Sequence, residues 1–226
     1  MISRKFLNLL CPLVFAAGLG AQGKDKMITP VETSPPTHLK PKTLILDGFW
    51  GWNSRWEDFR SQIDHQVGPC QIWHYDNSGR TSIEQLGARL AEELRKPNAP
   101  RNLVGYSMGG IVIREALRQT PEFHPDKVAL LHSPNYGTIV AYLLPLPALV
   151  EMRPGSTFMK RLDAAPWHIP TLATWCPGDL IVVPGSSGRW KKAQQTIRSD
   201  VPAHAWPMVS PSIHRAVIRF LLACPS

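Results

Sequence analysis

The sequence of 226 residues predicts an α/β fold in which a mostly parallel central sheet is covered by helices on both faces. Short apolar runs of strand length alternate along the chain with longer segments whose apolar residues recur at helical spacing. Such alternation implies parallel strands joined by right-handed crossovers. The strand candidates are apolar at successive positions, which indicates a sheet that is buried on both faces. Charged residues make up 19% and hydrophobic residues 43% of the chain, which excludes a disordered or fibrous protein.

The first 23 residues have the pattern of a secretory signal peptide. Arg4 and Lys5 form a positive segment, residues 6–20 form an apolar run, and small residues follow. The alternatives are an uncleaved membrane anchor or a buried helix. Residues 24–41 are rich in proline and polar residues and are predicted to be a flexible linker. We therefore expect a secreted or periplasmic protein with one folded domain over residues 42–226.

The strand candidates are short, and each is bounded by turn residues or by the start of a helical pattern. Five are apolar and the sixth is weaker; in chain order they cover residues 42–47, 71–75, 101–105, 127–132, 170–176 and 195–199. The helix candidates carry an apolar stripe such as Ile83, Leu86 and Leu90, and they cover residues 54–63, 82–94, 108–119 and 210–223. The third of these helices is expected to stop before Pro121.

The net charge is +8, and loss of Arg4 and Lys5 with a signal peptide would leave +6. A basic secreted protein is attracted to anionic surfaces, lipid headgroups among them, and peripheral membrane contact is therefore a hypothesis. Nucleic acid is not expected as a partner because no zinc spacing, RNA-binding motif or basic helix is present. No metal site or cofactor is predicted. Three cysteines would remain after processing, so at most one internal disulfide can form, among Cys70, Cys176 and Cys224.

The segment from Gly105 to Gly109 reads G-Y-S-M-G and lies between a predicted strand and a predicted helix. This is the context in which a G-x-S-x-G motif forms a sharp turn that exposes the serine hydroxyl. Glycines two residues before and after Ser107 relieve crowding at such a turn. Ser107 is therefore the candidate nucleophile. The alternative is a glycine-rich ligand-binding turn with a spectator serine, although no phosphate-binding glycine pattern is present.

With this motif and three others, "LHSPNYGT", "RPGSTFMKRLDA" and "PTLATWCPGDLIVVPGSSG", the sequence resembles the α/β-hydrolase superfamily, and specifically secreted bacterial lipases and esterases. The resemblance covers nearly all of the chain after Leu44. It implies a catalytic triad in the order serine, acid, histidine. The apolar segment 139–150 is short, so no large lid is expected.

That order implies Asp179 as the acid and His204 as the base. His204 lies in a loop before the last predicted helix, whereas His214 lies within that helix and is the weaker candidate. Asp179 follows a strand through a turn, which is where an orienting acid is expected, although a turn aspartate can also bond its own backbone. Asp200 is closer to His204 in sequence but lies on the other side of a predicted strand.

The resemblance also implies an oxyanion hole made of two backbone N–H groups, those of Phe49 and Met108. Two positions depart from the family pattern. Asp47 replaces a common histidine and puts the hydrogen-bond support of its loop in doubt. Tyr106 replaces a frequent histidine beside the nucleophile.

The predicted function is hydrolysis of carboxylic esters, with a small-molecule or lipid acyl ester as substrate. Trp50, Trp52, Trp206 and the apolar segment 139–150 are expected near the site and suggest an apolar acyl cleft, although such residues also pack cores. The alternatives are an acyltransferase or thioesterase with the same triad, and a non-catalytic secreted binding protein on a hydrolase scaffold.

Overall fold

The computed structural model describes residues 43–51 and 53–223. The predicted signal peptide (1–23) and linker (24–41) lie outside the described residues, as do Trp52 and Cys224. The described part falls within the predicted domain.

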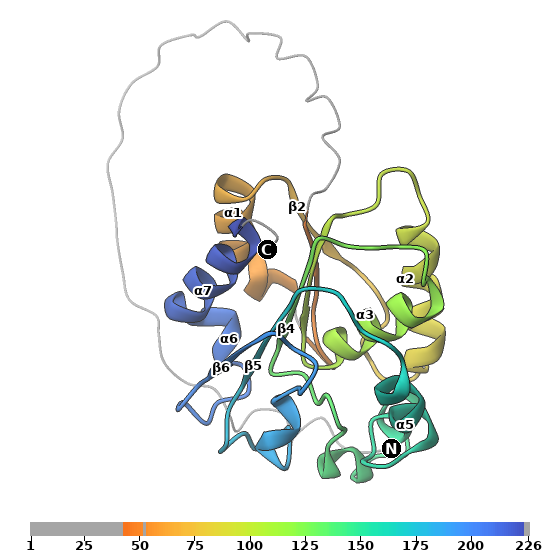
Figure 1. Cartoon of the computed structure of the whole chain (residues 1–226). Coiled ribbons are helices and arrows are strands. Elements are labelled where there is room, and N and C mark those ends of the chain that lie inside the picture. Colours follow the sequence, from red (N-terminus) through yellow and green to blue (C-terminus); the bar gives the residue numbers. More distant parts are fainter. Residues whose placement is uncertain (1–42, 52, 224–226) are drawn as a thin grey trace, which may run out of the picture. The chain divides into compact units, whose positions relative to one another are not determined.

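Six parallel strands form one sheet in the order β2-β1-β3-β4-β5-β6 (Figure 1). Every neighbouring pair of strands is parallel. In the register of the sheet, Leu46 of β1 lies opposite Trp73 of β2 on one side and Gly105 of β3 on the other. The strands are β1 (Thr43–Leu46), β2 (Cys70–Trp73), β3 (Asn102–Tyr106), β4 (Lys127–Leu131), β5 (Thr171–Trp175) and β6 (Gln195–Arg198). All six predicted strands, the weaker last one included, are confirmed.

Helices cover both faces of this sheet (Figure 1). On one face lie α1 (Glu57–Gln66), α6 (Trp206–Val209) and α7 (Pro211–Leu222), and on the other lie α2 (Ile83–Leu94), α3 (Met108–Gln119), α4 (Pro147–Glu151) and α5 (Thr157–Ala164). Short 3-10 turns occur at η2 (Asn53–Trp56), η3 (Ile139–Tyr142) and η4 (Gly185–Gly188). The helix predicted over residues 54–63 differs in its bounds: its first residues form the 3-10 turn η2, and the α-helix α1 that follows continues to Gln66. Serines begin three of the longer helices: Ser82, Ser156 and Ser210 each accept a backbone N–H bond at the helix start.

Two hydrophobic cores lie on the two faces of the sheet because successive strand residues point in opposite directions. In β1, Leu44 and Leu46 pack with α2 and α3, whereas Ile45 packs with α1 and α7. In β3, Leu103 and Val104 divide between the cores in the same way. This explains why the strand sequences are apolar without alternation.

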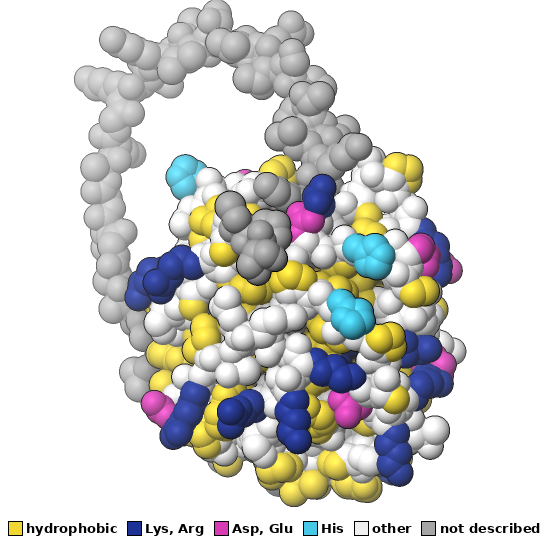
Figure 2. All heavy atoms as spheres, in the orientation of Figure 1, with side chains coloured by type: hydrophobic (Ala, Val, Ile, Leu, Met, Phe, Trp, Pro, Cys, Tyr) yellow, Lys and Arg dark blue, Asp and Glu magenta, His cyan; other side chains and the backbone are white. Residues whose placement is uncertain are grey.

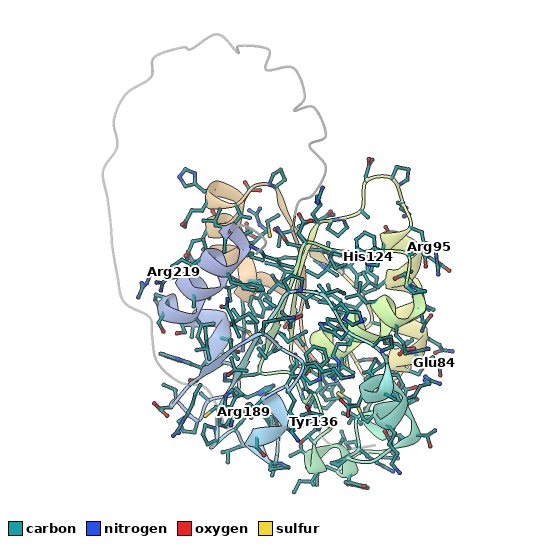
Figure 3. The ribbon with its side chains drawn as sticks, in the orientation of Figure 1. Glu84, Arg95, His124, Tyr136, Arg189 and Arg219 are labelled. Atoms are coloured by element: carbon teal, nitrogen blue, oxygen red, sulfur yellow. The ribbon has the colours of Figure 1, made fainter. Side chains whose placement is uncertain are left out.

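Because all six strands are parallel, the segments that follow them lie along one edge of the sheet, the edge formed by the carboxyl ends of the strands. Functional sites of parallel α/β sheets form at this edge. Tyr136 and Arg189 lie at that edge, whereas His124, in the loop before β4, lies at the opposite edge (Figure 3). No helix within residues 43–51 and 53–223 is long and apolar enough to cross a bilayer.

Candidate active site

The turn between β3 and α3 holds Ser107 in a strained backbone conformation, with φ 51° and ψ −124°. Glycines allow the surrounding chain to approach closely. A Cβ on Gly105 would lie 2.5 Å from the Cα of Gly110, and a Cβ on Gly109 would lie 2.5 Å from the carbonyl oxygen of Asp47. The strain and the crowding agree with the geometry expected of a G-x-S-x-G turn.

Ser107, His204 and Asp179 form a continuous hydrogen-bonded chain. The Ser107 Oγ lies 2.9 Å from Nε2 of His204, and Nδ1 of the same ring lies 2.8 Å from Oδ2 of Asp179. The three side chains come from the end of β3, the loop before α6 and the turn after β5. The structure thus brings together three residues that are up to 97 positions apart in sequence.

The carboxylate of Asp179 determines how the imidazole of His204 is protonated. Burial alone would raise the pKa of Asp179, but the imidazoles of His132 and His204 outweigh this effect and hold the pKa well below its usual range. An ionised carboxylate only accepts hydrogen bonds, so Nδ1 of His204 must donate. In the neutral ring Nε2 is then the acceptor, and it faces the Ser107 hydroxyl.

Asp179 also bonds its own turn. Its Oδ1 accepts the backbone N–H groups of Ile181 at 2.8 Å and Val182 at 2.9 Å, while Oδ2 faces His204. The two interpretations of this aspartate, a turn residue and a partner of the histidine, are therefore compatible. The turn fixes the carboxylate in the orientation that the imidazole needs.

The competing residues lie elsewhere. Asp200 is exposed and pairs with Arg198, its Oδ1 accepting from the guanidinium at 3.0 Å. His214 is buried in α7, where its Nε2 lies 3.0 Å and 3.1 Å from the carbonyl oxygens of Pro207 and Met208. Neither residue takes part in the hydrogen-bonded chain at Ser107.

Tyr106, the residue before Ser107, contacts the loop that carries His204. Its hydroxyl donates to the backbone carbonyl of His204 at 3.1 Å, and the two rings lie 5.1 Å apart. Burial raises the pKa of Tyr106 far above its usual value, so the hydroxyl stays protonated and able to donate. The departure from histidine at this position thus supplies an anchor for the His204 loop.

The loop after β1, where Phe49 was predicted to contribute to the oxyanion hole, packs directly on Ser107. A Cβ on Gly48 would lie 2.8 Å from the Cβ of Ser107. The buried carboxylate of Asp47 accepts the Gly48 N–H through Oδ1 at 2.7 Å and so supports its loop, while its Oδ2 has no hydrogen-bond partner within the described residues. Its pKa is raised by burial. Trp50 donates its N–H to the carbonyl of Asn77 at 3.0 Å, while the Phe49 N–H has no acceptor within the described residues.

Met108 is the other predicted oxyanion donor, and it is the first residue of α3. Its backbone N–H therefore lies among those that have no partner within the helix. It directly follows Ser107 in the chain.

An apolar cavity of about 370 Å³ opens beside Ser107 and His204. The segment 139–150 provides much of its wall, as expected, and Trp50 lines it as well. Its apolar lining residues are Phe49, Trp50, Val140, Ala141, Leu143, Leu144, Leu149, Met152, Ile181 and Val182. The expectation for Trp206 is wrong: it packs against the core beneath α1 and α7 and does not line this cavity. Trp52 lies outside the described residues.

Sequence reasoning missed His132, which follows β4 in a left-handed conformation with φ 45° and is 1% exposed. Its Nδ1 lies 3.4 Å from Oδ2 of Asp179. One metal-ligating atom of each of His132, Asp179 and His204 lies within 4.8 Å of the others. No sequence spacing reveals such a group: His132 meets Asp179 because β4 and β5 are neighbours in the sheet and their carboxyl ends lie side by side.

The cysteines play no part in this constellation. Cys70 and Cys176 are buried and are not bonded to each other. Burial raises the pKa of the Cys70 thiol to about 12, so it is held in its unreactive form. Cys224 lies outside the described residues, and disulfide pairing with it stays open.

Comparisons with known proteins agree with the architecture. No family model matches the chain, and no curated protein matches it. Among solved structures, lipase B of Aspergillus fumigatus has a TM-score of 0.65 at 13% identity and covers 86% of this chain. Lipase BlEst2 of Bacillus licheniformis has a TM-score of 0.64 at 19% identity and covers 88%. The thioesterase YbtT of the yersiniabactin pathway has a TM-score of 0.55 at 18% identity and covers 83%.

The chain spans about half the length of the two lipases, 55% and 53%, and corresponds to 96% of the thioesterase. At these identities the likeness concerns the fold. Sheet order, strand direction, the turn at Ser107 and these neighbours agree, and the chain has the α/β-hydrolase fold.

Proposed function

We propose that the protein is a serine hydrolase that cleaves carboxylic esters through an acyl-enzyme. The observation that supports this most strongly is the chain of hydrogen bonds from Ser107 through His204 to Asp179 at the mouth of an apolar cavity. A serine hydroxyl is a poor nucleophile unless a base lies within hydrogen-bond reach and a third group orients that base.

In the proposed mechanism, Ser107 Oγ attacks the acyl carbonyl while its proton passes to Nε2 of His204. Asp179 stabilises the resulting imidazolium. The N–H groups of Phe49 and Met108 hold the oxyanion, and each such donor typically contributes about 3 to 4 kcal/mol in the transition state. His204 then protonates the leaving alcohol, and water attacks the acyl-enzyme with the same residue acting as base.

The apolar lining of the cavity favours an acyl chain over a charged or sugar substrate. Apolar side chains in or next to the segments that form its wall are also exposed: Trp50, Ile139, Tyr142, Leu143, Leu180 and Ile181 are all about half exposed or more. Hydrophobic side chains gather along the lower edge in Figure 2, where the segment 139–151 lies in Figure 1. Together with the net charge of +8, this favours a lipid-like ester and peripheral contact with an anionic membrane. Export through residues 1–23 is part of the same proposal.

Hydrolysis of p-nitrophenyl esters of increasing acyl length tests the proposal. Each added methylene that enters the cavity should raise kcat/KM by up to about fourfold, from about 0.8 kcal/mol of apolar burial, until the cavity is filled. Ser107→Ala should abolish turnover, while Ser186→Ala, an exposed serine outside the cavity, should not. Preference for acetyl alone would contradict the long-acyl version.

A thioesterase or acyltransferase remains the second candidate, favoured by the likeness to YbtT over 96% of that chain. Acyl-coenzyme A and an added alcohol in the same assay separate the three activities. A higher kcat/KM for the thioester, or ester formation that outpaces hydrolysis, would replace the esterase proposal. Absence of turnover on every substrate by folded protein would favour a binding protein on a hydrolase scaffold.

A further inference from the structure

The buried ring of His132 makes no hydrogen bond within the described residues, and it faces the acid of the candidate triad. Its side chain is inaccessible to solvent, and neither ring nitrogen has a hydrogen-bond partner among the described residues. A buried polar group of this kind costs free energy when it lacks a partner. Its nearest acidic neighbour is Oδ2 of Asp179, at 3.4 Å, which is too long for a good hydrogen bond.

The three groups around this point have the chemistry of a transition-metal site. Two imidazoles and one carboxylate form a common ligand set for zinc. Two ligands on one tetrahedral zinc lie about 3.3 Å apart, given metal–ligand distances of about 2.0 to 2.1 Å. The Nδ1 of His132 is already at 3.4 Å from Asp179 Oδ2, whereas the Nδ1 of His204 at 2.8 Å would need to withdraw by about half an ångström. The three ligand atoms lie within 4.8 Å of one another, so metal binding would also draw the two imidazoles closer together.

We propose that His132, Asp179 and His204 form a binding site for a divalent transition metal such as zinc, and that the metal acts as a reversible inhibitor rather than as a cofactor. The site is anionic, since Asp179 is ionised and both imidazoles bind a metal in their neutral form. The charged side chain that faces His132 at this point is Asp179 itself.

The inhibition follows from the tautomer of His204 and rests on the proposed function. Nδ1 of His204 carries a proton that Asp179 accepts. A metal on Nδ1 takes the lone pair there, so the single proton of the neutral ring moves to Nε2. Nε2 can then no longer accept the proton of Ser107, and the serine stays a hydroxyl. No proton or electron is gained or lost by the ring in this step.

Metal binding can be measured without catalysis. Calorimetric titration of Ser107→Ala with zinc, and visible absorption of its cobalt complex, should show one site per chain. Adding His132→Asn should weaken zinc binding by at least about tenfold, since asparagine tolerates the left-handed backbone but is a poor zinc ligand. His132→Gly is a second variant suited to the positive φ, and His124→Asn, at the opposite edge of the sheet, is the matched control (Figure 3). Absence of saturable binding in Ser107→Ala, or equal binding after His132→Asn in folded protein, overturns the proposal.

Inhibition is the second measurement. Zinc should inhibit ester hydrolysis by the wild-type chain, a chelator should restore it, and magnesium, which prefers oxygen ligands, should have little effect. Expressed relative to each variant's own uninhibited rate, the inhibitory concentration should rise at least about tenfold in His132→Asn and stay unchanged in His124→Asn. Equal zinc sensitivity of wild type and His132→Asn contradicts the metal site. A wild-type chain that binds zinc through His132 but hydrolyses no ester contradicts the proposed function instead.

Discussion

The loop that carries His204 and the helix that carries His214 lie ten residues apart in sequence and use histidine in different ways. In the loop, both ring nitrogens face side chains, Ser107 on one side and Asp179 on the other. In α7, the ring donates to backbone carbonyls of α6 and stacks on Phe59 at 4.2 Å between ring centroids. The difference teaches that position in the fold, at a strand edge or inside a helix, decides what a histidine can do.

The electrostatic environments of the two regions differ as well. His214 has no carboxylate partner within hydrogen-bond reach in the described structure, and burial lowers its pKa despite the two carbonyl acceptors. His204 lies beside the ionised Asp179. Two histidines with different partners thus lie on either side of the short helix α6.

The largest expected effect is that of replacing His204 by asparagine, with the same replacement of His214 as the comparison. His204→Asn should lower kcat/KM for an ester by about 10⁴- to 10⁶-fold, because Ser107 loses its base. His214→Asn should change kcat/KM by no more than about threefold when measured at a temperature where the variant stays folded, since the hydrogen bonds of His214 go to Pro207 and Met208 and not to Ser107, His204 or Asp179. Comparable losses of kcat/KM in both variants would contradict the distinction between His204 and His214.

Removal of the charge on Asp179 should have the next largest effect. Asp179→Asn keeps the size of the side chain, but the backbone N–H groups of Ile181 and Val182 hold its amide oxygen, so the NH2 group faces Nδ1 of His204 and favours the tautomer with the proton on Nε2. We expect kcat to fall by about 10³- to 10⁴-fold with a smaller change in KM. Asp200→Asn is the matched control and should leave steady-state kinetics unaltered.

The fold was predictable from the sequence because strands buried on both faces leave a plain signal. The runs around Leu44, Val104 and Leu130 are apolar without alternation, and all six strands appear where predicted. The residues that meet at the site were found through motif order, which the resemblance supplied. His132 was missed because its partner is set by the adjacency of two strand ends, a fact that exists only in three dimensions.

Other details of the site also depended on packing. Trp206 is a large aromatic residue two positions after His204 and was therefore expected in the cleft. In the structure it begins α6 and packs against the core formed with α1 and α7. Asp47 departs from the family pattern and put the hydrogen-bond support of its loop in doubt, yet its carboxylate accepts the Gly48 N–H in that loop. Neither outcome follows from residue type or spacing, because both depend on which way a short segment turns.

A third, smaller effect should come from the anchor of the His204 loop. Tyr106→Phe removes the hydroxyl that donates to the His204 carbonyl and leaves the ring contact in place. A net hydrogen bond contributes about 1 kcal/mol, so kcat/KM should fall by up to about fivefold. The measurement is the pair of kcat and KM at a fixed pH, and an unchanged kcat/KM would show that the loop holds its position without this bond.

The smallest expected effect concerns the pH dependence of stability. Because burial lowers the pKa of His214 in the folded state, the unfolded chain binds more protons below about pH 6.5, and the free energy of unfolding should fall as the pH drops from 7.5 to 5. His214→Phe should lower stability at pH 7.5 by about 1 kcal/mol through loss of its hydrogen bonds, and should flatten that pH slope. Asp179 acts in the same direction but at lower pH: its lowered pKa adds stability that is lost only below about pH 4.

Denaturant titrations of wild type and His214→Phe at several pH values provide the check. A parallel pH slope in the two proteins would mean that His214 does not titrate differently on folding. The same titrations of His204→Phe provide a comparison, since this variant changes a histidine that lies in a loop rather than in the core.

The most direct test of the central claim, that His204 activates Ser107, is the rate at which a fluorophosphonate labels the folded chain. We predict one label per wild-type chain, located on Ser107 by mass spectrometry, none in Ser107→Ala, labelling slowed at least about 10³-fold in His204→Asn, and a rate within about threefold of wild type in His214→Asn. Folded wild-type protein that takes no label, or His204→Asn that is labelled as fast as wild type, would contradict the claim.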